Sequence, residues 1–318
     1  MSKKKNKIEE SFGTISKFNR ISPVSNAILV VLMILLAIVC LYPVLLMTVI
    51  SFTDQTSFGD KGYSLFPQSW NLEAYRTVAE LGSSLWRAYG VTIFRTVVGT
   101  LISLACMSMY AFVIAQKNFN CRKFYTYLMF FTMIFNAGMI PSYIINVRYL
   151  HLDDTIWILI LPGAMVASNV IILRTFITST IPDALFESAR IDGASNFRVF
   201  GQIVLPLFKP GLATIGLFCV VSRWNEWFTA ILYLNERTDL TPVQTVLQRI
   251  QQNMEYIQEQ LKHSAGSMTP EQMEAYRNMP TESFRMAITV IATVPILFAY
   301  PFFQRYFIEG LTIGSVKG

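Results

Sequence analysis

Six long apolar stretches constrain the fold of this chain more than any other feature. A helix needs about 20 largely apolar residues to cross a bilayer, and each stretch is close to that length. Hydrophobic residues make up 53% of the sequence and charged residues only 14%, whereas about 25% of a soluble globular chain is charged. The sequence therefore predicts an all-α membrane protein with six transmembrane helices. The stretches are residues 27–50, 91–115, 124–147, 155–173, 211–234 and 286–304.

The basic residues predict how these spans are oriented, because lysine and arginine concentrate in cytoplasmic loops. The tail of residues 1–26 is basic, so we expect a cytoplasmic N-terminus. Alternating spans then place the loop 179–209 and the C-terminus in the cytoplasm, and the loop 235–285 outside. The basic flanks explain the formal net charge of +6 without a nucleic-acid partner. The first stretch is too long for a cleaved signal peptide and lacks a small-residue cleavage site, so we expect it to be retained.

A polar segment interrupts the apolar pattern between the fourth and fifth stretches. Residues 187–194 read Glu-Ser-Ala-Arg-Ile-Asp-Gly-Ala. Gly193 favours the end of a first helix in a left-handed turn, and Ser195 or Asn196 favours the start of a second helix, which we expect Pro206 to stop. The pattern predicts a helix-turn-helix at a membrane face. An ordinary amphipathic surface helix is the alternative interpretation.

This hairpin resembles the cytoplasmic EAA loop of permease subunits in binding-protein-dependent ABC importers, with Ser188 where that family usually has alanine. Five further segments are similar to the carbohydrate class of these permeases, which carries oligosaccharides such as maltose. They extend the resemblance from the second apolar stretch to the last residue. The segments are Tyr110-Ala111, the run 138–143 (Gly-Met-Ile-Pro-Ser-Tyr), Leu161-Pro162-Gly163, Trp224-Asn225-Glu226-Trp227 and the run 310–318 (Gly-Leu-Thr-Ile-Gly-Ser-Val-Lys-Gly).

The resemblance implies a MetI-like, type I ABC importer permease domain over residues 27–318, in the multi-pass cytoplasmic membrane of a bacterium. It also implies a second homologous permease, two ATPase subunits, an extracellular sugar-binding lipoprotein and an oligosaccharide substrate. In that family the first hairpin helix sits in a groove of the ATPase, and the C-terminal tail reaches between the two ATPases. The implied coupling residues are Glu187, Ser188, Ala189, Asp192, Gly193, Leu205 and Pro206. The implied C-terminal contact residues are Gly310, Thr312 and Gly314.

No pattern in the sequence supports catalysis or a bound cofactor within this chain. There is no Gly-x-x-x-x-Gly-Lys-Ser/Thr segment to cradle phosphates, so we expect ATP and its magnesium on the partner ATPases. The two histidines, His151 and His263, have no second donor at metal-ligand spacing. We therefore expect a transport subunit and not an enzyme.

Polar residues within the predicted spans indicate where a sugar could pass, because they are costly in a membrane. Arg223 and Glu226 lie three residues apart, so we expect them to pair on one helical face and leave Asn225 and a tryptophan for the substrate. The alternatives are an interfacial aromatic belt for the tryptophans, a simple helix bend near Gly138, and an interhelical hydrogen bond for Asn169. The candidate pathway residues are Asn136, Tyr143, Asn169, Trp224, Asn225, Glu226 and Trp227.

The long loop 235–285 contains apolar residues at helical spacing from Val243 to Leu261, with polar residues between them. This pattern predicts an external amphipathic helix. Two roles remain open for it, which are docking of a solute-binding protein and a lid packed on the second permease.

Two other functions also remain open at this point. An ABC permease for a non-sugar solute would share the hairpin but is expected to lack the carbohydrate-class segments. A gradient-driven carrier would need no ATPase and usually has buried acidic residues in its spans, whereas Glu226 is the one acid well inside a predicted span.

Overall fold

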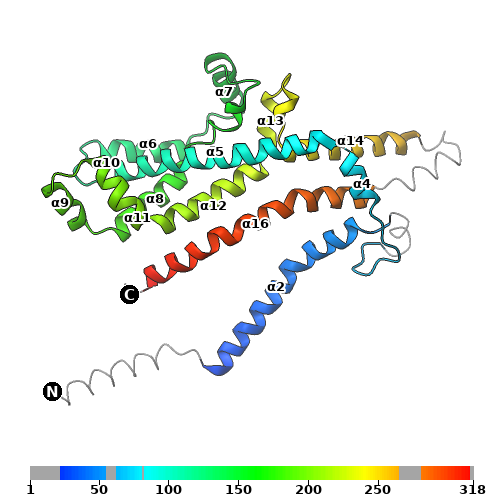
Figure 1. Cartoon of the computed structure of the whole chain (residues 1–318), viewed down its shortest axis with the longest axis horizontal. Coiled ribbons are helices and arrows are strands. Elements are labelled where there is room, and N and C mark those ends of the chain that lie inside the picture. The colour runs from blue at the N-terminus through cyan, green and yellow to red at the C-terminus, as the bar shows by residue number, and fades with distance from the viewer. Residues whose placement is uncertain (1–21, 55–61, 81, 265–280, 316–318) are drawn as a thin grey trace.

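The computed structural model describes residues 22–54, 62–80, 82–264 and 281–315. This part of the chain is helical and has no β-strand; a single isolated antiparallel bridge joins Thr53 and Trp70 (Figure 1). Residues 1–21 of the basic tail lie outside the described residues, as do residues 265–280 of the long loop.

Two helices are long and apolar enough to cross a membrane by themselves. They are α2 (Pro23–Ser51) and α5 (Gly82–Ala115), which contain the first and second predicted spans. α2 begins where the Ser22 side chain accepts a hydrogen bond from the Ser25 amide, with a proline at the first helical position. The short helix α4 (Glu73–Glu80) precedes α5, and the long helix α16 (Thr281–Ser315) contains the last predicted span.

Two further apolar segments are sharply bent. α6 (Arg122–Ile134) and the following α7 (Met139–Ile144) with its π-helical turn (Ile145–Tyr149) meet at 114°. Gly138 supplies that break with a φ of 87°, a conformation that glycine adopts readily. The second bend, of 81°, separates the segment 196–207 from α12 (Lys209–Asn225). If each bent pair is one span, the described residues contain up to four spans.

The predicted stretches 155–173 and 211–234 are therefore not continuous helices. A 3-10 turn (Ile156–Leu159) is followed by an irregular segment and then by α8 (Ala167–Thr180). The helix therefore begins at residue 167, whereas the predicted span began at residue 155. α12 ends at Asn225, and α13 (Phe228–Tyr233) continues after a two-residue break. Pro162 and Gly163 favour the first interruption because proline lacks an amide hydrogen and glycine is a poor helix former. The count of six spans and their orientation stay predictions.

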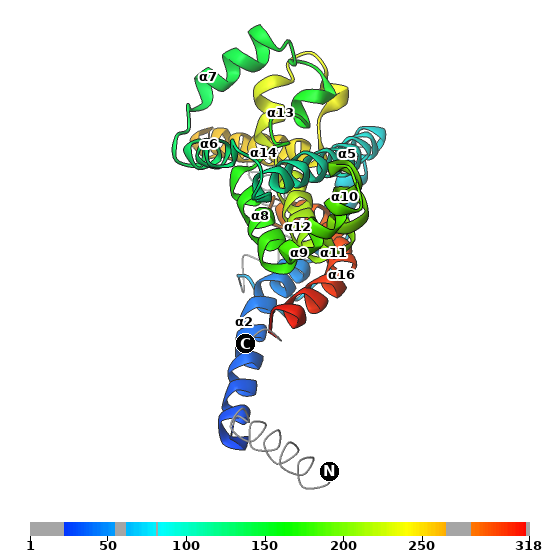
Figure 2. The ribbon, with the colours of Figure 1, turned by 90° about the vertical axis from the view of Figure 1, so that its left-hand side faces the viewer.

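α5, α8 and α12 pack together as the centre of the bundle, and α16 packs between α12 and α2. Both views place α2 and α16 on one side and α7 and α13 on the opposite side (Figures 1 and 2). Much of α2 is exposed in this single chain. The apolar core between α5, α8 and α12 includes Met107, Leu173, Ile177 and Ile215, which are fully buried.

The predicted amphipathic helix of the long loop is confirmed as α14 (Val243–Ser264), which follows a 3-10 turn (Thr238–Leu240). Its apolar side packs on α5 and α16, where Val243 and Leu247 are buried with Phe284 and Ala287. The Val243 amide also donates a 2.8 Å hydrogen bond to the Thr92 hydroxyl. α14 is thus part of the bundle at the end of α5 opposite the polar hairpin (Figure 1).

Candidate functional site

The polar hairpin folds as two helical arms joined by a tight turn. The first arm is α9 (Asp183–Ile191), and the second is α10 (Asn196–Val199) with a π-helical turn (Phe200–Val204) and α11 (Leu205–Leu207). Gly193 has a φ of 72°, and the Ser195 hydroxyl caps the second arm by accepting from the Arg198 amide at 3.3 Å. The predicted helix-turn-helix is confirmed. The second arm continues through Pro206 and stops at Leu207, one residue later than predicted.

Side chains of the first arm attach the hairpin to the end of α5. Ala189 is buried in the core, and the Phe186 ring packs against Phe112 of α5. The Arg190 guanidinium donates to the Gln116 side chain at 3.1 Å. Asp183 forms an ion pair with Lys117. These contacts join α9 to the end of α5 and to the two residues that follow it.

A groove of about 680 Å³ opens between the two arms. Of the predicted coupling residues, the structure brings Ser188, Ala189, Asp192 and Pro206 to its lining. Glu187 is exposed beside them and makes no hydrogen bond or ion pair within the described chain. The other two predicted residues support the shape of the hairpin, since Gly193 forms the turn and Leu205 begins α11.

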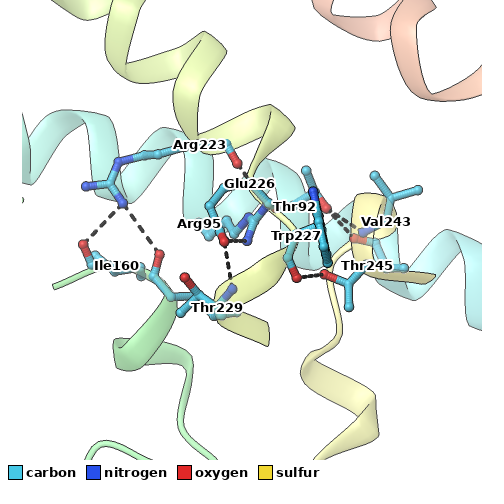
Figure 3. A network of polar contacts seen from close by, with 11 residues as sticks. Thr92, Arg95, Ile160, Arg223, Glu226, Trp227, Thr229, Val243 and Thr245 are labelled. Atoms are coloured by element: carbon cyan, nitrogen blue, oxygen red, sulfur yellow. Dashed lines mark hydrogen bonds and ion pairs between the residues drawn. The ribbon is translucent and has the colours of Figure 1, made fainter. Parts of the chain in front are cut away.

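A second polar cluster lies inside the bundle where α12 ends (Figure 3). Its central residue is Arg95 of α5, which is 1% exposed. The Arg95 guanidinium pairs with the Glu226 carboxylate at 3.2 Å and also donates to the backbone carbonyls of Arg223 and Glu226. Glu226 in turn accepts the Thr229 amide at 2.7 Å and so caps α13. Arg95 and Glu226 together satisfy backbone groups that the helix break leaves without helical partners, as burial requires.

The predicted ion pair between Arg223 and Glu226 is wrong. Glu226 has extended backbone, with φ −73° and ψ 125°, so the helical spacing on which we based that pair does not apply. Arg223 instead donates to the carbonyls of Ile160 and Gly163, both at 3.1 Å, and to the Ser103 hydroxyl at 2.8 Å. These carbonyls belong to the interrupted segment before α8. The break after α12 and the irregular segment before α8 are therefore each stabilised by an arginine from a neighbouring helix.

Sequence reasoning missed Arg95. The available signal was an arginine inside the otherwise apolar stretch 91–115, because an ionisable residue within a span usually has a buried partner or a functional role. Nothing local could show that its partner lies 131 positions later.

The two arginines and Glu226 line one cavity of about 260 Å³. Two of the predicted pathway residues, Asn169 and Glu226, are in this lining. The cavity walls come from α5, α8, α12 and α13 and from the irregular segment before α8. The lining residues are Arg95, Ile158, Leu159, Pro162, Gly163, Val166, Asn169, Phe218, Cys219, Ser222, Arg223, Glu226 and Thr229.

The remaining predicted pathway residues lie outside the cavity lining. Trp224 is buried and its indole donates to the Ala292 carbonyl of α16 at 3.0 Å, which is a packing role. Asn225 and Trp227 are exposed at the α12 break. Tyr143 stacks on the Tyr233 ring at 5.4 Å. Asn136 accepts the Gly138 amide at 2.9 Å and so supports the bend after α6.

Comparison with known proteins gives consistent matches over most of this chain. The family model described as "Binding-protein-dependent transport system inner membrane component" matches residues 107–312. The polygalacturonan/rhamnogalacturonan transport system permease protein YtcP of Bacillus subtilis (strain 168) is 37% identical, over 90% of this chain and 96% of that protein. The trehalose/maltose transport system permease protein MalG of Thermococcus litoralis is 27% identical, over 92% of this chain and 96% of that protein.

One solved structure has the same fold over nearly its whole length. It is a chain of a bacterial ABC transporter involved in the import of the acidic polysaccharide alginate. The match has a TM-score of 0.73 and 29% sequence identity, and it covers 91% of this chain and 99% of that chain.

Proposed function

This chain belongs to the family of binding-protein-dependent transport system inner membrane components, and from that premise we propose that it is a permease subunit of an ABC importer for an oligosaccharide. The observation that carries the proposal is the alignment, over nearly the full length of both chains, with permeases named for polysaccharide and disaccharide transport. The fold shared with a chain of the alginate importer supports the same function.

In the proposed mechanism, separate ATPase subunits supply the energy and bind ATP with its magnesium. The hairpin 183–207 provides the surface that they contact. Its groove offers small and polar side chains from both arms. The Phe186 ring packs α9 on α5, and Asp183 of α9 pairs with Lys117, two residues past the end of α5. Closure of the ATPases would shift α9 and α5 together, and α5 carries Arg95 at the cavity. This route couples the hairpin to the spans by rigid-body movement.

The proposed complex contains a second homologous permease, two ATPases and an extracellular sugar-binding lipoprotein, and it lies in the cytoplasmic membrane. The exposed apolar surface of α2 supports contact with lipid or with the second permease. Gly310, Thr312 and Gly314 occur in the last turns of α16, and we propose that this end of the helix contacts the ATPases. The sugar pathway is proposed to include the cavity at the α12 break.

Purification and reconstitution test this function. The chain is tagged at its native level, extracted in mild detergent, and its co-purifying subunits are identified by mass spectrometry. The complex is then placed in proteoliposomes with its binding protein, and uptake of a panel of oligosaccharides, amino acids and peptides is measured. We expect an ATPase and a second permease in the complex, and oligosaccharide uptake that requires ATP. Uptake by the chain alone, without an ATPase, would contradict the proposal.

A further inference from the structure

We propose that the cavity at the α12 break binds a carboxylate group of the transported sugar, so that the permease carries oligosaccharides with uronic acid units. This inference rests on the proposed function and names its substrate class. It assigns a substrate-binding role to Arg223, Asn169 and Ser222, which share the cavity lining with the Arg95–Glu226 ion pair. Figure 3 shows Arg95, Arg223 and Glu226.

The charges around the cavity do not balance. Its lining contains two guanidinium groups and one carboxylate. The carboxylate of Glu226 is already engaged by Arg95 and by the Thr229 amide. Arg223 takes part in none of the ion pairs formed within the described residues, and its hydrogen-bond partners are neutral carbonyls and a hydroxyl. The cavity therefore has one positive charge that the described chain does not neutralise.

Burial makes this charge significant. Arg223 is only 9% exposed, and a buried ion without a counter-ion is costly because it has lost its hydration. A bound anion would recover part of that cost, whereas a neutral sugar would not. Both Nη atoms of Arg223 already donate to protein acceptors, so a carboxylate would be attracted by the charge across the cavity and hydrogen-bonded by the Asn169 and Ser222 side chains.

The arginines are also held firmly enough to select a ligand. Gly99 allows close approach, since a Cβ at that position would lie 2.5 Å from the Arg223 Nη1 atom. Arg95 is fixed by Glu226 and two carbonyls, yet its buried Nε has no hydrogen-bond partner in the described chain. A fixed, positively charged wall attracts an anion without the cost of ordering long side chains.

Two polar side chains in the lining have unused hydrogen-bonding capacity. Among the contacts of the described residues, neither the Asn169 amide nor the Ser222 hydroxyl has a protein partner, and both line the cavity with Arg223. An amide and a hydroxyl are suitable for binding sugar hydroxyls or a carboxylate oxygen. The volume of about 260 Å³ is near the lower end, about 300 Å³, of small-molecule sites, so the cavity suits one sugar unit of a longer chain.

Equilibrium binding to the whole transport complex, with the binding protein left out, tests this inference. The two probes are trigalacturonate and its fully methyl-esterified form, which has the same sugar backbone without the negative charges. Isothermal titration calorimetry on the complex in nanodiscs gives both dissociation constants. We expect the acid to bind at least about tenfold more tightly at low salt, with the difference shrinking as salt screens the charges.

The key variant is Asn169→Asp, which adds a negative charge to the cavity and leaves the hydrogen bonds of Arg223 intact. We expect it to weaken acid binding about tenfold more than ester binding, because both probes lose the same amide and only the acid meets a new negative charge. Asn120→Asp makes the same chemical change at an exposed residue of the α5–α6 connection and is expected to alter neither constant. Ser222→Asp gives an independent second test with the same expected result.

The possible outcomes separate this inference from the proposed function. Equal binding of acid and ester by the unaltered complex would overturn the inference, as would an Asn169→Asp effect that is the same for both probes. Those results would leave the importer function intact, provided that the reconstituted complex still takes up an oligosaccharide with ATP. Failure of ATP-dependent uptake for every oligosaccharide tested would instead contradict the proposed function.

Discussion

At the scale of single residues, buried arginines satisfy the backbone where apolar helices are interrupted. Arg95 accounts for the carbonyls at the end of α12, and Arg223 accounts for those before α8. Both arginines are thus structural, and Arg223 also leaves its charge at the cavity. Of the two tryptophans predicted for the sugar pathway, Trp224 is committed to α16 through its indole hydrogen bond.

Replacing Arg95 tests the first of these roles. Arg95→Met keeps a long side chain but removes the guanidinium group, so the Glu226 carboxylate and two carbonyls lose this donor. Removal of one partner of a buried ion pair typically costs about 3 kcal/mol or more, so we expect a clear fall in the unfolding temperature of the detergent-solubilised complex. Arg87→Met alters an exposed arginine of the same helix and should change the unfolding temperature little. Similar unfolding temperatures for the two variants would contradict the assigned role.

Gly99 tests how closely α5 and Arg223 are packed. In Gly99→Ala the new methyl group would fall within 2.5 to 2.8 Å of three guanidinium atoms, and overpacking of this kind costs about 1 to 3 kcal/mol. Gly90→Ala on the same helix meets no atom within 4 Å, so it is the matched control. Scanning fluorimetry is expected to show a lower unfolding temperature for Gly99→Ala only. An unchanged temperature there would show that Arg223 moves freely.

At the scale of elements, polar side chains help to fasten the connections between helices. Asp154 illustrates this between the turn at 152–154 and the loop after α13. One oxygen of its carboxylate accepts the amides of Asn235, Glu236 and Arg237 at 2.9 to 3.1 Å. The left-handed backbone of Asp154, with a φ of 50°, is tolerated better by aspartate than by most residues.

This contact is expected to depend on pH. The backbone hydrogen bonds from Arg237 and Glu236 lower the pKa of Asp154 below its ordinary value of 3.8. The folded form therefore gains stability above that ordinary pKa and loses it as the pH falls through the lower, folded pKa. Hydrogen exchange should show that the amides 235–237 are protected at neutral pH and lose protection below about pH 4. Asp154→Asn should remove this pH step, whereas Asp153→Asn should retain it.

The hairpin is the second element with a testable role. Glu187→Ala removes an exposed carboxylate without an intramolecular partner, so we expect no change in the unfolding temperature of the permease. We expect a loss of sugar-stimulated ATPase activity and of uptake in proteoliposomes, because the ATPase contact loses its acidic group. Glu236→Ala changes an exposed acid at the other end of the bundle and should leave both activities unchanged. Full uptake and complex assembly with Glu187→Ala would refute our assignment of the coupling helix.

At the scale of the whole molecule, the hairpin and the 235–240 loop lie toward opposite ends of the bundle (Figure 1). The charge distribution predicts that the hairpin end is cytoplasmic. In a cysteine-free background, we expect Asn196→Cys to react with a membrane-impermeant maleimide only after the cytoplasmic side is exposed. Glu236→Cys should react in intact cells that have only their outer face exposed. The reverse labelling pattern would invert the predicted topology.

Much of this molecule could be predicted from local sequence signals. The length of α2 follows from its apolar run, and the hairpin follows from Gly193, Ser195 and the polar residues that precede them. The amphipathic helix α14 also follows from its own periodicity. In each case the decisive physical effect acts within one helix or one turn, so nearby residues contain the information.

The helix breaks and the pairing of buried charges were decided only by the tertiary structure. An apolar run favours a span whether or not it is interrupted, since a break becomes tolerable only when another helix satisfies its carbonyls and amides. For the segment before α8 that helix is α12, and for the end of α12 it is α5. Glu226 accordingly pairs with Arg95 and not with the nearby Arg223, because the break rotates its carboxylate toward α5. Such choices depend on contacts between residues far apart in the chain, which local sequence patterns do not specify.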